Sequence, residues 1–367
     1  MPGRGPVADA GIPAVAQEIT PDWLTHVLQA SALGGARVTA ACPTSFGTEE
    51  AFSGGRLYRV DLTLDRPVPG APASLVAKLS PEDPALRSTM RPANARETAF
   101  YRNLAPGSGL PVPYCYHAAQ DAASGASILL LQDLTAARRV PFTTGCTAAD
   151  ARRVIKALAI VHARWWNDPA LPGAGGPAIL LDVPFRVAWA LYPARLRNIL
   201  PGTDLPAAFL RLGDHIAAHE ADIFARLTEA GPLTLLHRDP QADNVIFTEK
   251  DALLLDWQFC GKGRGVQDLA YFLISSLDPT LRRALETELV AHYHDLLIRA
   301  GVGDYTLADV WADYRIAVVG KLLLSVAATV FLDNTGPAKA LWRAADLQRL
   351  LAFCDDHQVS DHMLRQA

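Results

Sequence analysis

Three polar side chains between residues 233 and 258 lie where short apolar runs begin or end. Asp239 follows the first run, Asn244 opens the second and Asp256 closes the third. A hairpin in this segment can gather the three side chains around one point. The amide oxygen of Asn244 and the carboxylate of Asp256 are hard oxygen ligands that suit Mg²⁺. The Asp239 carboxylate can accept a proton from an attacking hydroxyl, so the pattern predicts metal-assisted chemistry on a hydroxyl group.

A purely structural role competes with this interpretation, because a carboxylate beside a strand often only caps a loop. The occurrence of all three side chains in one hairpin favours a site over separate caps. His237, two residues before Asp239, is expected to hydrogen-bond the loop rather than to carry protons.

The same residues resemble the catalytic region of the protein-kinase-like phosphotransferases. His237-x-Asp239-x4-Asn244 matches their catalytic loop, and Asp256 matches their metal-binding aspartate. Catalytic loop and metal aspartate together span residues 237–258. The resemblance implies an α+β, bilobal protein-kinase-like fold with a small antiparallel-sheet lobe and a mainly helical lobe.

More narrowly, the chain is similar to the aminoglycoside phosphotransferase and choline kinase superfamily. Asp256-Trp257-Gln258 and the run at 268–273 look most like its ecdysteroid-kinase-like (CHK kinase-like) branch. The similarity is strongest over residues 230–275 and extends over about residues 20–360. By this resemblance, Asp268 is the residue that braces the catalytic loop through backbone N–H groups.

The resemblance also assigns nucleotide-binding residues in the first third of the chain. Lys78 would hold the α- and β-phosphates, and Glu97 would pair with Lys78 and fix its position. The backbone of Gln132 and Leu134 would meet the adenine at a hinge between the lobes. ATP and Mg²⁺ are the implied cofactors, with GTP left open as the nucleotide.

A loop over residues 45–55 could fold over the phosphates. Its candidate contacts are Gly47, Ser53 and Gly54, where small side chains let backbone N–H groups approach the ligand. The loop departs from G-x-G-x-x-G, and Glu49 and Glu50 are poor neighbours for a triphosphate.

Periodicity predicts the elements that carry these residues. Alternating apolar residues indicate a strand at 58–64, a second strand is expected at 74–79, an apolar run follows at 127–131, and a short helix is expected at 94–104. The remainder is expected to be mostly helical, with helix starts at Thr147, Asp278 and Thr306 and one long amphipathic stretch at 204–230. The predicted domains are a β-rich lobe at 1–132 and a helical lobe at 133–367.

The amino-acid composition limits the kinds of partner that the protein is expected to bind. A net charge of −4 gives no bulk basic field for nucleic acid or an anionic membrane. Five scattered cysteines indicate no disulfide framework, and no signal peptide is visible, so a cytoplasmic protein is expected. The apolar stretch 316–332 is short and contains Lys321, which favours a buried helix over membrane insertion. Oligomeric state is left open.

These observations predict a small-molecule kinase that transfers the γ-phosphoryl group of ATP to a hydroxyl. A protein kinase is disfavoured because only 12 residues separate Asp256 from Asp268 and no Ala-Pro-Glu follows. A nucleotide-binding protein without transferase activity, of the pseudokinase type, remains the alternative. Residues 139–232 hold ten basic and eight acidic residues, which disfavours a polycationic aminoglycoside as acceptor. Aromatic residues in that segment favour a neutral or partly hydrophobic one.

Overall fold

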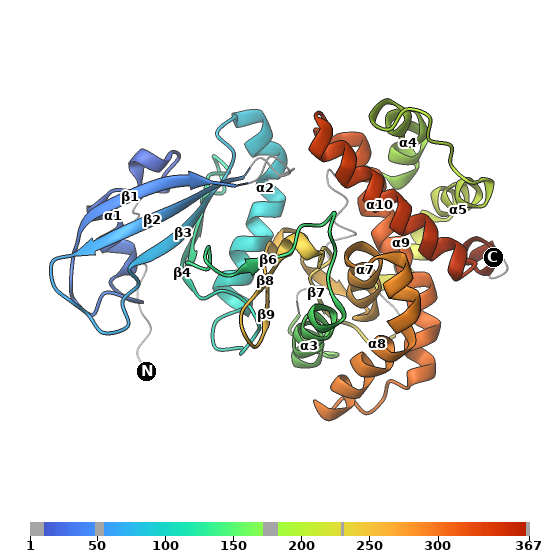
Figure 1. Ribbon diagram of the computed structural model, residues 1–367. Helices are drawn as coiled ribbons and strands as arrows, with labels where there is room; N and C mark the ends of the chain where they lie inside the picture. Colours follow the sequence, from blue (N-terminus) through green and yellow to red (C-terminus); the bar gives the residue numbers. More distant parts are fainter. Residues whose placement is uncertain (1–10, 48–54, 172–182, 229–230, 365–367) are drawn as a thin grey trace. The chain divides into compact units, whose positions relative to one another are not determined.

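The computed structural model describes residues 11–47, 55–171, 183–228 and 231–364. The chain divides into two compact units (Figure 1). We call them the sheet unit, which comprises residues 1–106 and 113–136, and the helical unit, which comprises residues 107–112 and 137–367.

The sheet unit is built on a five-stranded antiparallel sheet in the order β1-β2-β3-β5-β4. The predicted strands are present, with β2 and β3 as adjacent antiparallel partners. Figure 1 shows these strands in blue and green. Their bounds are Val38–Phe46 (β1), Arg56–Leu64 (β2), Ser74–Leu79 (β3), Cys115–Gln120 (β4) and Ser127–Gln132 (β5).

Alternation along β3 decides which side chains enter the core. Leu75, Ala77 and Leu79 are buried and pack in one hydrophobic cluster with the leucines of helix α1 (Pro21–Leu28). Side chains of a strand point alternately to opposite faces, so Lys78 lies on the other face of the sheet. The strand therefore presents a cation away from the apolar core that holds it in place.

The helix predicted at 94–104 begins ten residues earlier than expected, and that boundary was wrong. Helix α2 spans Pro84–Ala99 and continues into a π-helical turn, η2 (Phe100–Leu104). Asp83 caps its start by accepting hydrogen bonds from the next turn, and proline occupies the first position. Pro92 inside the helix hides this start, because a proline usually marks a boundary.

Helices form most of the helical unit, and α9 packs against α4 and α7 while α3 packs against α8 (Figure 1). The starts predicted at Thr147, Asp278 and Thr306 are confirmed as N-caps. The helices are α3 (Ala148–Arg164), α4 (Phe185–Ile199), α5 (Ala207–Ala218), α6 (Glu220–Thr228), α7 (Val266–Ser276), α8 (Pro279–Arg299), α9 (Leu307–Phe331), α10 (Pro337–Asp356) and α11 (Val359–Leu364).

One helix prediction in this unit needs correction. The amphipathic stretch at 204–230 forms two helices, α5 and α6, rather than one. His219 separates them with a non-helical backbone, φ −121° and ψ 27°. The apolar period continues through this break, so periodicity alone does not reveal it.

Short strands interrupt the helices and carry the polar segment of interest. Antiparallel pairs join β8 to β9, β6 to β8 and β7 to β10. The three apolar runs predicted between residues 233 and 255 are confirmed as β7, β8 and β9. The bounds are Arg138–Arg139 (β6), Thr234–Leu236 (β7), Val245–Phe247 (β8), Ala252–Leu254 (β9) and Gly261–Gly263 (β10), with 3-10 turns at Ala242–Asn244 (η3) and Trp257–Phe259 (η4).

Helix α9 is long and apolar enough to cross a membrane by length and composition, with a mean hydropathy of 1.6 over its most apolar window. That window is 78% buried inside the protein. Lys321, near its middle, is 1% exposed. The helix thus has the burial of a core helix, as predicted for the stretch at 316–332.

Candidate active site

The segment after β7 is fixed by Asp268, in the first turn of α7. Its Oδ2 accepts a hydrogen bond from the backbone N–H of His237 at 2.6 Å, and its Oδ1 accepts one from Arg238 at 2.8 Å. His162 of α3 lies 3.2 Å from the same carboxylate. Asp268 therefore braces the loop that leads to Asp239, as the resemblance implied.

His237 is fully buried and serves the same loop. Its Nδ1 accepts a hydrogen bond from the N–H of Asp239 at 3.2 Å, so the ring proton is on Nε2, which donates to Leu255 O at 2.7 Å. Burial lowers the pKa of His237 and keeps the ring neutral. The structural role predicted for this histidine is confirmed by these contacts.

Both oxygens of the Asp239 carboxylate are held. Oδ1 accepts a hydrogen bond from the hydroxyl of Tyr271 at 2.6 Å, and Oδ2 accepts one from Nδ2 of Asn244 at 2.9 Å. Asp239 is 8% exposed, and burial raises its pKa to about 7, with the nearby negative charge of Asp256 acting in the same direction. The hydrogen bonds oppose this rise without cancelling it. The structure thus brings the three predicted side chains together.

Asn244, in turn η3, and Asp256, directly after β9, are the candidate metal ligands. Nδ2 of Asn244 donates to both the backbone oxygen and the carboxylate of Asp239, so its amide oxygen is the atom suited to a cation. The charge of Asp256 adds to that of a second, buried carboxylate, and a cation would relieve this repulsion. The donor set therefore fits Mg²⁺, with phosphate and water oxygens completing its coordination.

No group of three or more His, Cys, Asp or Glu side chains forms a metal site within the described ranges. A site that relies on one amide oxygen and few carboxylates is the kind that Mg²⁺ uses when it shares a phosphate.

The backbone of this segment is strained at two points. Arg238 has φ 68° and Asp256 has φ 63°, in the left-handed region that non-glycine residues rarely adopt. Such conformations cost about 1–3 kcal/mol each and persist where the surroundings enforce them, often at functional sites. Here the Asp268 hydrogen bond to Arg238 supplies part of that enforcement.

In the sheet unit, Lys78 and Glu97 form an ion pair. The ammonium lies 2.9 Å from Oε1 and 2.8 Å from Oε2 of the carboxylate. The side chains are 16% and 4% exposed, so water reaches the lysine more than the glutamate. The contact expected between these residues is present, and their binding of phosphates remains a prediction.

The other nucleotide-binding predictions remain predictions too. The N–H of Gln132 donates to Tyr114 O at 2.8 Å, at the end of β5. Leu134 follows Asp133, whose carboxylate accepts hydrogen bonds from Ser74 and Thr135. Gly47 comes directly after β1. Ser53 and Gly54, with most of the loop between β1 and β2, lie outside the described residues.

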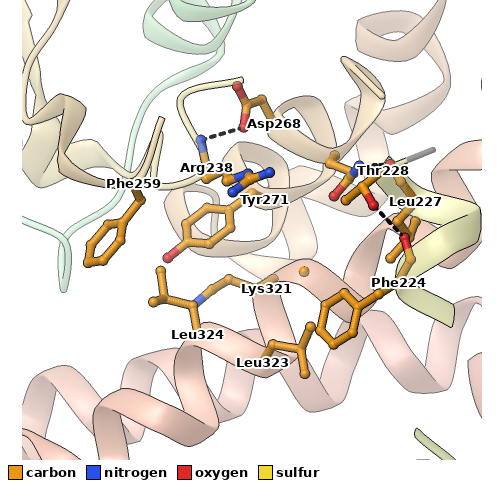
Figure 2. A pocket seen from close by; sticks show the side chains of 12 residues that line it. Phe224, Leu227, Thr228, Arg238, Phe259, Asp268, Tyr271, Lys321, Leu323 and Leu324 are labelled. Carbon is orange, nitrogen blue, oxygen red and sulfur yellow. Dashed lines mark hydrogen bonds between the residues drawn. The ribbon is translucent and has the colours of Figure 1, made fainter. Parts of the chain in front are cut away.

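A cavity of about 60 Å³ lies in the helical unit, beside the tyrosine that holds Asp239 (Figure 2). Its wall is mainly apolar, and in the part of the chain that the structure describes Asp268 is its acidic lining residue and Arg238 and Lys321 are its cations. The lining residues are Phe224, Leu227 and Thr228 of α6, Arg238, Phe259, then Gln267, Asp268 and Tyr271 of α7, and Gly320, Lys321, Leu323 and Leu324 of α9.

Sequence reasoning located this cavity only in part. Of the aromatic residues in segment 139–232, which favoured a partly hydrophobic acceptor, Phe224 lines the cavity, whereas Trp189 stacks with Phe185 and Tyr192 inside the helical core. Tyr271 and Lys321 were missed as site residues. The signal that could have found Lys321 was a single cation inside the apolar stretch 316–332.

Comparison with known proteins agrees with this geometry. A sequence profile of the phosphotransferase enzyme family (APH) matches residues 62–306. A solved structure from Ralstonia eutropha JMP134, provisionally described as an aminoglycoside phosphotransferase, is similar with 16% identity and a TM-score of 0.52, covering 93% of this chain and 96% of that chain. The predicted protein-kinase-like α+β fold is thereby confirmed.

Two further structures show more distant similarity. A choline/ethanolamine kinase family protein from Mesorhizobium loti has 16% identity and a TM-score of 0.47, covering 90% of this chain and 94% of that chain. A choline kinase from Streptococcus pneumoniae has 13% identity and a TM-score of 0.48, covering 86% of this chain and 94% of that chain. No curated protein sequence matches the chain significantly.

Proposed function

Because the chain belongs to the phosphotransferase enzyme family, a group of small-molecule kinases, we propose that it transfers the γ-phosphoryl group of ATP to a hydroxyl of a small, neutral or partly hydrophobic molecule. The observation that carries this proposal is the Asp239 carboxylate, which Tyr271 and Asn244 hold beside the charge of Asp256.

Asp239 is the proposed catalytic residue. A carboxylate fixed at both oxygens can still accept a hydrogen bond from an acceptor hydroxyl through its remaining lone pairs. It would orient the hydroxyl oxygen toward the phosphorus and take up its proton as the new bond forms. The brace from Asp268 keeps the loop from moving during this step.

Asn244 and Asp256 are proposed to hold Mg²⁺, which supplies charge neutralisation for the transferring phosphoryl group when it is bound. Lys78 would add positive charge at the nucleotide phosphates. Glu97, 2.8 Å from the lysine ammonium, would keep that side chain extended toward its ligand.

The cavity beside Tyr271 is the proposed site for an apolar part of the acceptor, whose hydroxyl would lie at Asp239, outside the described cavity lining. Among the described lining residues the acid is Asp268, which already accepts two backbone hydrogen bonds, and Lys321 places a positive charge in the wall. A cationic aminoglycoside or amine therefore finds little electrostatic complementarity there. Its volume of about 60 Å³ is far below that of a pocket for a whole drug-sized ligand, so only part of the acceptor would enter.

Within the family, we propose that the chain belongs to the ecdysteroid-kinase-like branch. The support is the sequence Asp256-Trp257-Gln258 together with Asp268-Leu269-Ala270-Tyr271. The apolar lining of the cavity supports the same placement, because it suits a hydroxylated, partly hydrophobic acceptor.

Thermal unfolding with ATP and with GTP, each with and without Mg²⁺, tests the nucleotide site first. Ligand at 100 times its dissociation constant stabilises the native state by about 2.7 kcal/mol, so a Mg²⁺-dependent rise of the midpoint is expected. ADP release is then measured with a panel of neutral alcohols, sterol-like alcohols, sugars and aminoglycosides. Faster release with aminoglycosides than with every neutral compound would contradict the proposed acceptor class.

Asp239→Asn is expected to lower turnover by roughly 10²–10⁴-fold, because an amide cannot take up the acceptor's proton. The midpoint shift with Mg²⁺ and ATP should stay close to that of the unchanged protein. Asp243→Asn is the matched control, since Asp243 lies in the same loop but accepts from Phe142 N–H and Trp342 Nε1. Turnover retained in Asp239→Asn would show that Asp239 is not the catalytic base.

A further inference from the structure

Tyr271 joins the cavity to the catalytic carboxylate. Its ring lines the cavity wall, as Figure 2 shows, and its hydroxyl donates to Oδ1 of Asp239 at 2.6 Å. The side chain is 4% exposed, and burial raises the pKa of Tyr271 well above its usual value, so the phenol remains a donor. Tyr271 therefore contacts both the cavity, through its ring, and the proposed base Asp239, through its hydroxyl, so that binding in the cavity can affect the position of the base.

Lys321 holds the other side of that tyrosine. Its ammonium lies 4.8 Å from the centre of the Tyr271 ring, a distance at which a cation is attracted to an aromatic face (Figure 2). The same ammonium donates to Ser325 Oγ at 2.7 Å and to Asp346 Oδ1 at 2.5 Å. Helices α9 and α10 therefore fix the cation, and the cation in turn restrains the ring carried by α7.

The carboxylate is thus constrained from two directions. Asn244 fixes Oδ2 from turn η3, and Tyr271 fixes Oδ1 from α7, so rotation about the side-chain bonds of Asp239 would break one bond or the other. Effective transfer requires the base to hold the acceptor oxygen in a narrow range of positions, and a displacement of about 1 Å can lower the rate by about 100-fold.

We propose that Tyr271 is a positioning residue for Asp239, with Lys321 restraining the tyrosine ring. This inference rests on the proposed function, because it assumes that Asp239 is the base. It adds that the orientation of the base depends on helices α7, α9 and α10 rather than on the catalytic loop alone.

A buried tyrosine hydroxyl on a carboxylate can also be merely structural, and the helical unit contains such a pair. Tyr314 of α9 donates to Glu286 Oε1 at 2.7 Å, and its side chain is fully buried. The two tyrosines make the same chemical contact with different carboxylates, which makes Tyr314→Phe a matched control for Tyr271→Phe.

The test compares both variants by ADP release from Mg²⁺-bound ATP, with the best acceptor from the alcohol panel or with water. Tyr271→Phe should lower kcat by about 10- to 100-fold with the KM for ATP unchanged. Tyr314→Phe should lose comparable thermal stability while its kcat stays within about twofold. Equal kcat values in the two variants, or a rise of kcat in Tyr271→Phe, would overturn the proposal.

A crystal structure of Tyr271→Phe supplies a readout that needs no turnover. We expect the Asp239 carboxylate to rotate away from its present orientation or to occupy two conformers. A single, unmoved carboxylate would overturn the proposal even if the protein turned out to lack kinase activity. Failure of the proposed function has its own signature, which is an Asp239→Asn variant that retains full turnover.

Discussion

The region around Lys78 in the sheet unit and the region around Lys321 in the helical unit both contain a lysine paired with a carboxylate. Lys78 is 16% exposed and lies 2.8 Å from Glu97. Lys321 is 1% exposed, lies 2.5 Å from Asp346, and has a second hydrogen bond to Ser325. One lysine occupies a strand of a sheet, and the other sits in the middle of an apolar helix.

Access to water separates the two pairs. Lys78 can meet a ligand from solvent, so its charge is available for phosphates as proposed. Lys321 is closed off from bulk water, so its charge acts on neighbours such as Tyr271 and Asp239 and on the cavity that it lines. An ion pair alone therefore does not identify a phosphate-binding lysine. The exposure of the lysine side chain decides whether a phosphate can reach its ammonium from solvent.

Among substitutions at these charged pairs, Lys321→Met should have the largest effect on stability. It breaks the buried ion pair of Asp346, which is 3% exposed and keeps the attraction of the nearby charges of Arg343 and Arg349, and breaking such a pair costs up to about 3–5 kcal/mol of the free energy of unfolding. Urea unfolding measures this loss. The double variant Lys321→Met/Asp346→Leu should recover much of it, and a double variant no more stable than the single one would contradict the assignment.

Lys78→Met should lower turnover by roughly 10²–10³-fold through loss of positive charge at the phosphates. Its effect on stability should be smaller than that of Lys321→Met, because water reaches the Lys78 pair. Lys78→Met/Glu97→Gln removes the leftover charge of Glu97 and should regain stability without regaining turnover. Full turnover in either variant would contradict the proposal that Lys78 binds the phosphates. The two lysines would then not differ in function.

Asp133→Asn should have the smallest effect of these substitutions on the free energy of unfolding. It tests an ion pair whose cation, Arg59, is exposed. Burial opposes ionisation of Asp133, but hydrogen bonds from Ser74, Thr135 and Arg59 prevail and lower its pKa to about 2. Because the folded pKa lies below the usual 3.8, its stabilisation is present above that pH and is lost as pH falls through about 2.

The variant should therefore be less stable by about 1 kcal/mol at pH 7, after screening by water, and equal to the unchanged protein near pH 2. Urea unfolding at both pH values checks this. A difference that persists at the lower pH would show that the carboxylate contributes through packing instead of charge.

Local pattern explains why the catalytic segment could be predicted. Asp239, Asn244 and Asp256 lie within a short hairpin, so their meeting depends on neighbouring residues and on turns that the sequence displays. The strands of the sheet unit were predictable for the same reason, since alternation along β2 and β3 reflects one buried face.

Tyr271 and Lys321 could not be predicted, because their contact depends on how α7 packs on α9. Fifty residues separate them along the chain, and no local pattern encodes the angle between the two helices. Lys321 was noticed only as an interruption in an apolar stretch. Its role in restraining Tyr271 becomes evident only in the structure, where Asp346 and the Tyr271 ring contact its ammonium.

The left-handed backbone at Arg238 and Asp256 has a consequence for laboratory evolution of this protein. Glycine at either position would relax the strain, and at position 238 it would also remove the hydrogen bond from the Arg238 guanidinium to Lys262 O. The same change would remove an arginine from the cavity wall or the carboxylate proposed to bind metal. Relief of backbone strain and loss of a site side chain therefore act in opposite directions at these two positions.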